Sequence, residues 1–367
     1  MKIVPDVLDA LFDCEVDTRV GDLCLCGNAS PVYRCIDCTQ RPPSCNTCLA
    51  SSHRHSPLHR VQKWTGAYFC RSSLSHCGLR WYLGHDGSPC PAARGEGVAS
   101  TIVDVNGLHS MDVVYCGCRG AAAPPRQLLA ASLYPASWTS PRTAFTFRLM
   151  KHHHLDSLQS RKPAYDYWAL LRRLTDNTRG DGVPDRYEEL LRASREWRCL
   201  MRLKRSGQEL GIAKHLPHGS TSVGVTCVAC PRPGFNMPAN WKEMQTAENA
   251  YINGLFLGID GNFRAVLKVK KHDADDVPLL DGRSYFVSTE PFLKYQAAAP
   301  TDPNESTCSD LRSMHMVTNR KGVLVTGIIA VVCVRHSCYC LNAVLDMTLG
   351  EKCVCHSLLD HRVTICA

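Results

Sequence analysis

The spacing of apolar residues predicts helices in the middle of the chain. After Pro163, apolar positions recur every three or four residues at Tyr167, Leu170, Leu171 and Leu174. This period places them on one face of a helix. Two glycines and a proline in residues 178–184 then interrupt the pattern, so the helix is expected to end there.

A second, more basic helix is predicted from Asp185, where Glu188 three residues later gives a capping-box-like start. Its apolar stripe consists of Tyr187, Leu190, Leu191, Trp197, Leu200 and Met201. Much of the remaining surface is basic: Arg192, Arg195, Arg198, Arg202, Lys204 and Arg205. Such a helix could lie along a phosphate backbone. Alternatively, it packs through its stripe and leaves the arginines solvated.

Other segments have the pattern of strands. Residues 100–105 are rich in β-branched side chains and run into the Asn106-Gly107 turn signal. Residues 255–259 form an apolar strand that ends at Asp260. The longest apolar run, residues 322–334, is 13 residues long, which is short of the roughly 20 needed to span a bilayer. We expect it to form a buried strand and expect no membrane association.

Length limits the number of domains, and charge indicates the type of partner. A chain of 367 residues has room for about two or three domains. The formal net charge is +8, and residues 148–205 contain 14 Lys/Arg against 8 Asp/Glu. A basic patch of this kind favours a polyanion such as nucleic acid, although a solvated helix surface has the same composition.

The 22 cysteines call for a chemical explanation. The acidic start of the chain, with Asp6, Asp9 and Asp13, does not resemble a secretory signal. We therefore expect reduced thiols that are available to metal rather than disulfides. Twelve of the cysteines and six of the 16 histidines precede residue 120, which concentrates the potential ligands in one region.

Eight of these ligands form four consecutive pairs, as expected for two structural zinc ions. Interleaved pairing gives a cross-brace in which the first ion is held by Cys24, Cys26, Cys45 and Cys48. The second ion is then held by Cys35, Cys38, His53 and His59, with His55 as an alternative to either histidine. Sequential pairing has the same composition and stays open. Because four protein ligands fill each site, the zinc should be structural rather than catalytic.

Three further groups have weaker spacing signals. His85, Cys90, Cys116 and Cys118 could close a third zinc site if the predicted hairpin between them forms, although they could also be core thiols beside a surface histidine. A second possible tetrad combines Cys308 and His315 with Cys333 and His336. Finally, Cys227 and Cys230 could share an ion with His215 and His218.

Residues 24–177 resemble the CxC-type cysteine-cluster domain found at the front of Kyakuja-Dileera-Zisupton (KDZ) transposases of fungi. The matching residues are Cys24-Leu25-Cys26-Gly27, Cys45-Asn46-Thr47-Cys48, His53, Pro57-Leu58-His59-Arg60-Val61, Trp64, Gly78-Leu79-Arg80, Leu83-Gly84-His85, Asp104-Val105-Asn106-Gly107-Leu108-His109, Tyr115-Cys116-Gly117-Cys118, Pro141-Arg142-Thr143-Ala144-Phe145-Thr146-Phe147 and Leu174-Thr175-Asp176-Asn177. The segment around Cys227-Val228-Ala229-Cys230 resembles the junction before the catalytic domain.

Residues 250–351 resemble the KDZ catalytic domain itself, through Asp260-Gly261-Asn262-Phe263-Arg264, Tyr285-Phe286-Val287, Thr326-Gly327 and Cys333-x2-His336. The resemblance implies a ribonuclease H-like fold and makes Asp260 the first of three catalytic acids that hold Mg²⁺. The other two acids are expected beyond Glu351, but the sequence ends at Ala367. Asp346, Glu351 and Asp360 are possible substitutes that no spacing selects. We therefore expect Asp260 to be a relic, with Mg²⁺ relevant only to a complete catalytic domain.

These observations predict a multidomain α+β protein. The expected parts are an extension (1–22), a zinc module (23–118), a basic helical middle (119–245), a partial ribonuclease H-like α/β fragment (246–352) and a divergent tail (353–367). The expected function is DNA binding or targeting by a transposon-derived protein, in the nucleus by family resemblance. The two alternative functions are those of an active transposase and of a zinc-dependent adaptor that binds proteins.

Overall fold

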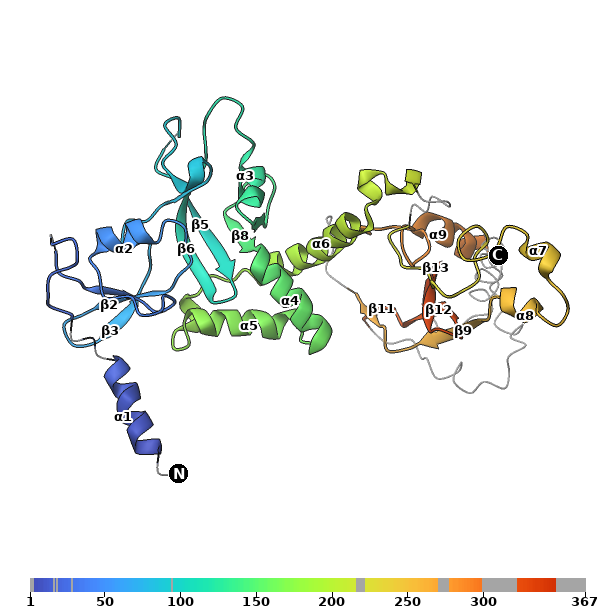
Figure 1. Ribbon diagram of the computed structural model, residues 1–367, viewed down its shortest axis with the longest axis horizontal. Coiled ribbons are helices and arrows are strands. Elements are labelled where there is room, and N and C mark those ends of the chain that lie inside the picture. The colour runs from blue at the N-terminus through green and yellow to red at the C-terminus, as the bar shows by residue number, and fades with distance from the viewer. Residues whose placement is uncertain are drawn as a thin grey trace. The chain divides into compact units, whose positions relative to one another are not determined.

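A computed structural model describes residues 3–15, 17, 19–27, 29–93, 95–215, 222–269, 277–298 and 322–347. The chain divides into two compact units, residues 1–198 and 199–367 (Figure 1). Both contain helices and sheets, so the mixed α and β content expected from the sequence is confirmed.

The first unit combines helices with two sheets, and its first helix is exposed along its whole length. Its helices are α1 (Val4–Glu15), α2 (Asn46–Ser52), α3 (Pro124–Ala130), α4 (Phe147–Gln159), α5 (Ala164–Thr175), η1 (His85–Gly87) and η2 (Gly180–Gly182). Its strands are β1 (Tyr33–Cys35), β2 (Val61–Trp64), β3 (Phe69–Ser72), β4 (Trp81–Tyr82), β5 (Val98–Asp104), β6 (Gly107–Val114), β7 (Leu133–Pro135) and β8 (Thr143–Thr146). Every residue of α1 is at least partly exposed, whereas α2 buries Leu49 completely.

A small antiparallel sheet of β1, β2 and β3 lies beside α2 (Figure 1). Cys35 at the end of β1 pairs with Val61 at the start of β2. Both residues are buried in a core that also includes Leu49 and Leu74. This register brings the residues that follow β1 close to those that precede β2.

The larger sheet of the first unit has the strand order β4-β6-β5-β8-β7. The hairpin predicted at Asn106-Gly107 is confirmed, because β5 and β6 pair antiparallel from Val98↔Val113 to Asp104↔Gly107. Strand β8 pairs with β5 in parallel, and β7 pairs with β8. The segment expected to be a helical middle therefore also contributes two strands to this sheet. The physical reason is that all four residues of β8 are buried on both faces of the sheet, so its pattern has no alternation to reveal it.

Helices α4 and α5 cover this sheet, and the predicted apolar face of α5 is confirmed in part. Tyr167 and Leu171 are 1 % exposed, whereas Leu170 and Leu174 are 41 % and 38 % exposed. The buried carboxylate of Asp104 accepts hydrogen bonds from Thr146 and from the guanidinium of Arg148. Burial opposes the ionisation of Asp104, but the hydrogen bonds from Arg148 and then Thr146 prevail and hold its pKa below the usual value.

Helix α6 (Tyr187–Ser206) corresponds to the predicted basic helix and runs through the boundary between the units in sequence. The Asp185 side chain accepts the backbone N–H of Tyr187 at 3.0 Å, as expected for a residue that starts a helix. Leu190, Ala193 and Trp197 are buried.

The second unit contains an antiparallel sheet with the order β13-β12-β9. Its elements are η3 (Gln208–Leu210), η4 (Ile212–His215), α7 (Trp241–Met244), α8 (Ala250–Asn253), α9 (Thr289–Ala298), β9 (Leu257–Asn262), β10 (Leu267–Lys268), β11 (Val323–Val325), β12 (Gly327–Cys333) and β13 (Cys338–Met347). The apolar run 322–334 forms β11 and β12, and Ile329 and Val331 are fully buried, which confirms the predicted buried strand. One face of the sheet packs against Phe292 and Tyr295 of α9.

Within the described part of the chain, no helix has the length and apolar character needed to cross a membrane. The ribonuclease H-like assignment of the second unit stays a prediction.

Candidate metal centres

Four groups of cysteine and histidine side chains gather in the described residues, and each group could hold a metal ion. Within each group, all four ligand atoms lie within 4.8 Å of one another. The groups are Cys24, Cys26, Cys45 and Cys48 (cluster 1); Cys35, Cys38, His53 and His59 (cluster 2); His85, Cys90, Cys116 and Cys118 (cluster 3); and Cys227, Cys230, Cys333 and His336 (cluster 4).

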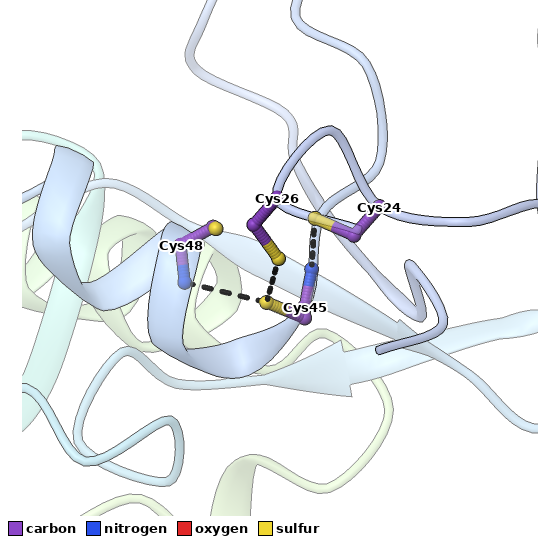
Figure 2. Close-up of side chains that lie close together, drawn as sticks. All are labelled: Cys24, Cys26, Cys45 and Cys48. Carbon is purple, nitrogen blue, oxygen red and sulfur yellow. Dashed lines mark hydrogen bonds between the residues drawn. The ribbon is translucent and has the colours of Figure 1, made fainter. Parts of the chain in front are cut away.

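Cluster 1 has four sulfur atoms around one point (Figure 2). Two come from the loop before β1, and two from the start of α2, where Cys45 is the N-cap residue and its sulfur accepts the backbone N–H of Cys48. The Sγ atoms of Cys26 and Cys45 are 3.8 Å apart. Tetrahedral zinc with bonds of about 2.3 Å places two sulfurs about 3.8 Å apart, so the spacing suits such an ion.

The thiols of cluster 1 also have opposed acidities. The pKa of Cys24 is lowered to about 6, mainly because the backbone N–H groups of Cys26 and Cys45 donate to its sulfur. In contrast, the pKa of Cys48 is raised to about 12, first by the neighbouring thiol of Cys45 and then by that of Cys26. Four thiolates this close repel one another, and a divalent cation would remove the conflict.

Cluster 2 is assembled around the same helix. His53 follows the last residue of α2, and both nitrogens of its buried ring have a partner. Nδ1 is 2.9 Å from the carbonyl oxygen of Leu49, and Nε2 is 3.4 Å from the sulfur of Cys38. A hydrogen bond from Nδ1–H to the carbonyl would leave Nε2 as the ligand atom, which is the arrangement typical of metal-bound histidine. His59 Nδ1 lies 3.6 Å from Cys35 and 3.3 Å from Cys38.

Ligands of cluster 1 lie at the start of α2, and a ligand of cluster 2 directly follows its end, so this helix connects the two clusters. The structure groups the eight ligands as interleaved pairing predicts, and not sequentially. His55, weighed as an alternative ligand, is not in either group. Asp37, between the two cysteines of cluster 2, forms a 2.7 Å ion pair with Arg60 and so links the residues on either side of the site.

Cluster 3 lies where the β5–β6 hairpin brings its flanking segments together. His85 Nε2 is 3.3 Å from Cys116 Sγ and 3.4 Å from Cys118 Sγ, and Cys90 Sγ is 3.6 Å from Cys118 Sγ. Sulfur and nitrogen ligands of a tetrahedral zinc ion are separated by about 3.5 Å. Gly84 has φ 91°, and a Cβ there would lie 3.3 Å from Cys116, so glycine allows the two loops to approach.

The ligands of cluster 3 repeat the pattern of acidity found in cluster 1. Desolvation opposes ionisation of Cys90, but the backbone N–H groups of Gly117 and Ala92 prevail and lower its pKa to about 6. The pKa of Cys118 is raised to about 11, first by the thiol of Cys90 and then by that of Cys116.

Cluster 4 combines two pairs for which the sequence predicts different sites. Cys333 and His336 were expected to share an ion with Cys308 and His315, which lie outside the described residues. The structure places Cys227 and Cys230 beside them instead. The proposed partners of this second pair were His215, which is not in the group, and His218, which is outside the described residues. Spacing could not reveal the grouping, because about a hundred residues separate the two pairs.

The turn between β12 and β13 positions half of cluster 4. Cys333 ends β12, and His336 lies in the turn with Nδ1 3.3 Å from Cys333 Sγ and 3.3 Å from Cys227 Sγ. Cys230 Sγ is 3.1 Å from Cys333 Sγ. Desolvation opposes ionisation of Cys227, but its pKa is lowered to about 6 by its interactions with Cys230 and the local backbone. The pKa of Cys230 is raised by desolvation and then by Cys333.

Asp260, the expected first catalytic acid, is exposed on β9. It lines an open hollow of about 440 Å³ on one face of the sheet, together with Arg264, Ala330 and Tyr339. Its side chain accepts the backbone N–H of Gly261 at 2.8 Å.

Asp346, the candidate second acid within the described residues, lies too far from Asp260 to share a metal ion with it. Asp346 is on the same sheet face, because the registers Asn262↔Ile328 and Ile328↔Asp346 align their side chains. However, β12 separates the two acids, and ideal strand spacing and rise put them about 12 Å apart. One Mg²⁺ ion with oxygen ligands at about 2.1 Å cannot bind both. Glu351 and Asp360 lie outside the described residues.

The basic residues predicted to contact nucleic acid lie mainly on the exposed side of α6. Arg192, Arg195, Arg198, Lys204 and Arg205 are exposed, whereas Arg202 is half-buried. The Arg202 guanidinium donates to the carbonyl of Val223 at 2.5 Å, and Arg198 donates to Ser157 at 3.2 Å. At least part of this basic surface therefore stabilises the local fold.

Comparison with known families gives two matches. Residues 74–179 match the CxC2-like cysteine cluster associated with KDZ transposases, and residues 253–360 match the Kyakuja-Dileera-Zisupton transposase family. The first match contains cluster 3 and follows clusters 1 and 2, and the second contains Asp260 and half of cluster 4. Together they cover more than half of the chain. No curated protein and no solved structure matches the sequence.

Proposed function

We propose, for a chain that belongs to the KDZ transposase family, a role in binding DNA through modules that zinc holds together. The observation that carries the proposal is the convergence of four ligand atoms in each of four clusters. In each cluster the protein supplies all four positions of a tetrahedron, so no position is left for an activated water molecule. The zinc ions would therefore be structural.

The exposed side of α6 supplies the most suitable surface for DNA. Its buried residues Leu190 and Trp197 fix one side of the helix in the protein, and five exposed basic residues extend over the remainder. Regularly spaced cations on a rigid helix attract the phosphate backbone without requiring a particular base sequence. We expect binding in the nucleus, where a transposase-family protein meets its DNA.

Catalysis is not part of this proposal for the described residues. Strand transfer by metal ions requires several carboxylates around a pair of ions about 4 Å apart. Among the residues that the structure describes, Asp260 belongs to no group of three or more potential metal ligands, and Asp346 is too far away to share an ion with it. It would therefore contribute negative charge to the hollow without holding Mg²⁺ by itself.

The DNA-binding proposal is tested by fluorescence anisotropy with a labelled 30-base-pair duplex between 50 and 200 mM salt. Arg195→Gln/Lys204→Gln/Arg205→Gln should weaken binding and reduce the salt dependence, since each phosphate contact contributes about one unit to the logarithmic salt slope. The matched control Arg126→Gln/Lys242→Gln/Lys294→Gln removes the same charge from exposed residues elsewhere. Equal behaviour of both triple variants would contradict a DNA surface on α6, and binding that ignores salt would favour the protein-adaptor alternative.

A nicking assay separates DNA binding from catalysis. Purified protein with supercoiled plasmid and Mg²⁺ or Mn²⁺ should leave the plasmid intact. Nicking by the wild-type protein that disappears in Asp260→Asn would support the active transposase instead.

A further inference from the structure

Cluster 4 differs from the other clusters because a fifth candidate ligand lies beside it. Cys338 begins β13 and pairs directly with Cys333 of β12. Residues that face each other in an antiparallel pair project from the same face, with Cβ atoms about 5 Å apart. Since Cys333 is one of the four ligands, Cys338 starts on the correct side of the hairpin to replace another.

The Cys338 thiol is already in contact with the surroundings of the site. Its sulfur donates to the carbonyl of His336 at 3.4 Å. Its side chain is also close enough to interact with that of Cys227. Cys338 is nevertheless outside the group of four whose ligand atoms all lie within 4.8 Å. It therefore stands next to the ligand set without belonging to it.

The other clusters lack such a neighbour among the cysteines that the structure describes in the first unit. Cys77 shares an apolar core with Cys35, but its sulfur donates to the carbonyl of Ser73 at 3.5 Å. The raised pKa of Cys77, about 11, comes from burial and not from a thiol of cluster 2. Cluster 3 has His85 as its single histidine, which makes it the natural comparison for cluster 4.

We propose that cluster 4 is a zinc site with five donors, in which Cys227, Cys230 and Cys333 are permanent ligands and either His336 or Cys338 completes the tetrahedron. In the exchange one zinc–nitrogen bond breaks and one zinc–sulfur bond forms. The thiol proton of Cys338 passes to the released imidazole or to water. The zinc then has four thiolate ligands, a combination that is common in structural sites.

The exchange would keep zinc bound in the second unit when His336 is not a ligand. Both donors belong to the β12–β13 hairpin, so a change of side-chain rotamer can move the ligand without altering strand pairing. Cys333 also faces Leu257, the first residue of β9, and the metal thus holds the end of the sheet on which Asp260 lies. A site with a spare ligand would maintain this connection more reliably than an ordinary tetrad.

The test rests on the zinc binding proposed above and measures zinc per chain in the full-length reduced protein by mass spectrometry of the metal. His336→Ala should retain the wild-type amount, and so should Cys338→Ser. The double variant His336→Ala/Cys338→Ser should lose one equivalent. The matched variant His85→Ala, which removes the histidine of cluster 3, should also lose one equivalent, because no spare thiol is expected there.

Cobalt substitution supplies a second readout. In His336→Ala the sulfur-to-cobalt charge-transfer absorption should increase relative to wild type, because the site changes from three thiolates to four. Loss of one equivalent from His336→Ala alone, or retention of all zinc by the double variant, would overturn the five-donor proposal. Those results differ from failure of the proposed function, in which the wild-type protein would itself contain no zinc.

Discussion

Two parts of the first unit are expected to derive their stability from different sources. The region of clusters 1 and 2 has one short helix, three short strands and few large buried side chains, such as Leu49 and Val61. The five-stranded sheet beside it buries Phe145, Tyr167 and many other apolar residues almost completely. Because Leu49 and Val61 share one core with Ile102 and Met111 of the sheet, the difference is one of degree, and we expect the cluster region to depend more strongly on its ligands.

The difference follows from the surface that each region can remove from water. A small module cannot offset its conformational entropy by apolar burial alone. Structural zinc binding contributes about 10–16 kcal/mol in small zinc-finger peptides, which is enough to replace a missing core. The sheet with α4 and α5 is expected to depend less on metal, because its buried side chains make extensive contacts.

The largest effect should follow from Cys45→Ala, which removes a ligand of cluster 1 and the N-cap of α2 together. The protein should lose one zinc ion, and amide exchange in residues 24–64 should become fast. Exchange in β5, β6 and β8 should remain slow, because the pairing of these strands with one another involves no residue of cluster 1. The control is Cys70→Ala, which removes a thiol of β3 that is in none of the four clusters. Equal exchange in the two variants would argue against a metal-dependent module.

A smaller effect, in the opposite region, is expected from Phe145→Ala. Phe145 is completely buried, and loss of such a side chain costs about 3–5 kcal/mol. Urea unfolding should show this destabilisation of the five-stranded sheet while the zinc content stays unchanged. Tyr68→Ala, at a side chain that is 64 % exposed, serves as the control and should have little effect. Zinc loss from Phe145→Ala under native conditions would show that the two regions are not independent.

The smallest of the three effects concerns pH. His153 of α4 is 2 % exposed, stacks on Tyr167 at 4.6 Å and has no hydrogen-bond partner at either ring nitrogen. Burial, followed by the charge of Arg198, lowers its pKa from 6.5 to about 4. The folded state therefore favours the neutral ring. Its contribution is complete above about pH 6.5 and is lost as the pH falls toward 4.

Replacing His153 by Phe should remove this part of the pH dependence. Between pH 7 and pH 5 the wild-type protein should lose about 2 kcal/mol more stability than His153→Phe, as measured by urea unfolding at both values. Loss of zinc at low pH affects both proteins and cancels in the comparison. An identical pH dependence would mean that His153 does not titrate as its burial implies.

Sequence reasoning was most informative where ligands are close in the chain. A pair such as Cys35-x2-Cys38 is set by a local turn, and the Asn106-Gly107 signal correctly predicts the hairpin that joins the halves of cluster 3. The composition of cluster 4 could not be predicted, because it depends on which distant loop packs against the β12–β13 turn. The strands β7 and β8 were missed for a related reason, since buried residues without alternation do not distinguish a strand from part of a helix.

The carboxylate at position 260 illustrates the same limit for function. The apolar strand before Asp260 is evident in the sequence, and β9 confirms it. However, the position of a second acid depends on strand order, and the order β13-β12-β9 places Asp346 on the far side of β12. Neither spacing nor composition contains that information.

The central claim is that zinc in the cysteine and histidine clusters organises the protein, and metal content combined with hydrogen exchange tests it most directly. Reduced, chelator-free protein should contain zinc in an amount that accounts for the four clusters. Removing this zinc with a chelator should abolish slow exchange in residues 24–64 while β5, β6 and β8 retain it. Protein that contains no zinc and yet shows slow exchange throughout residues 24–64 would contradict the claim.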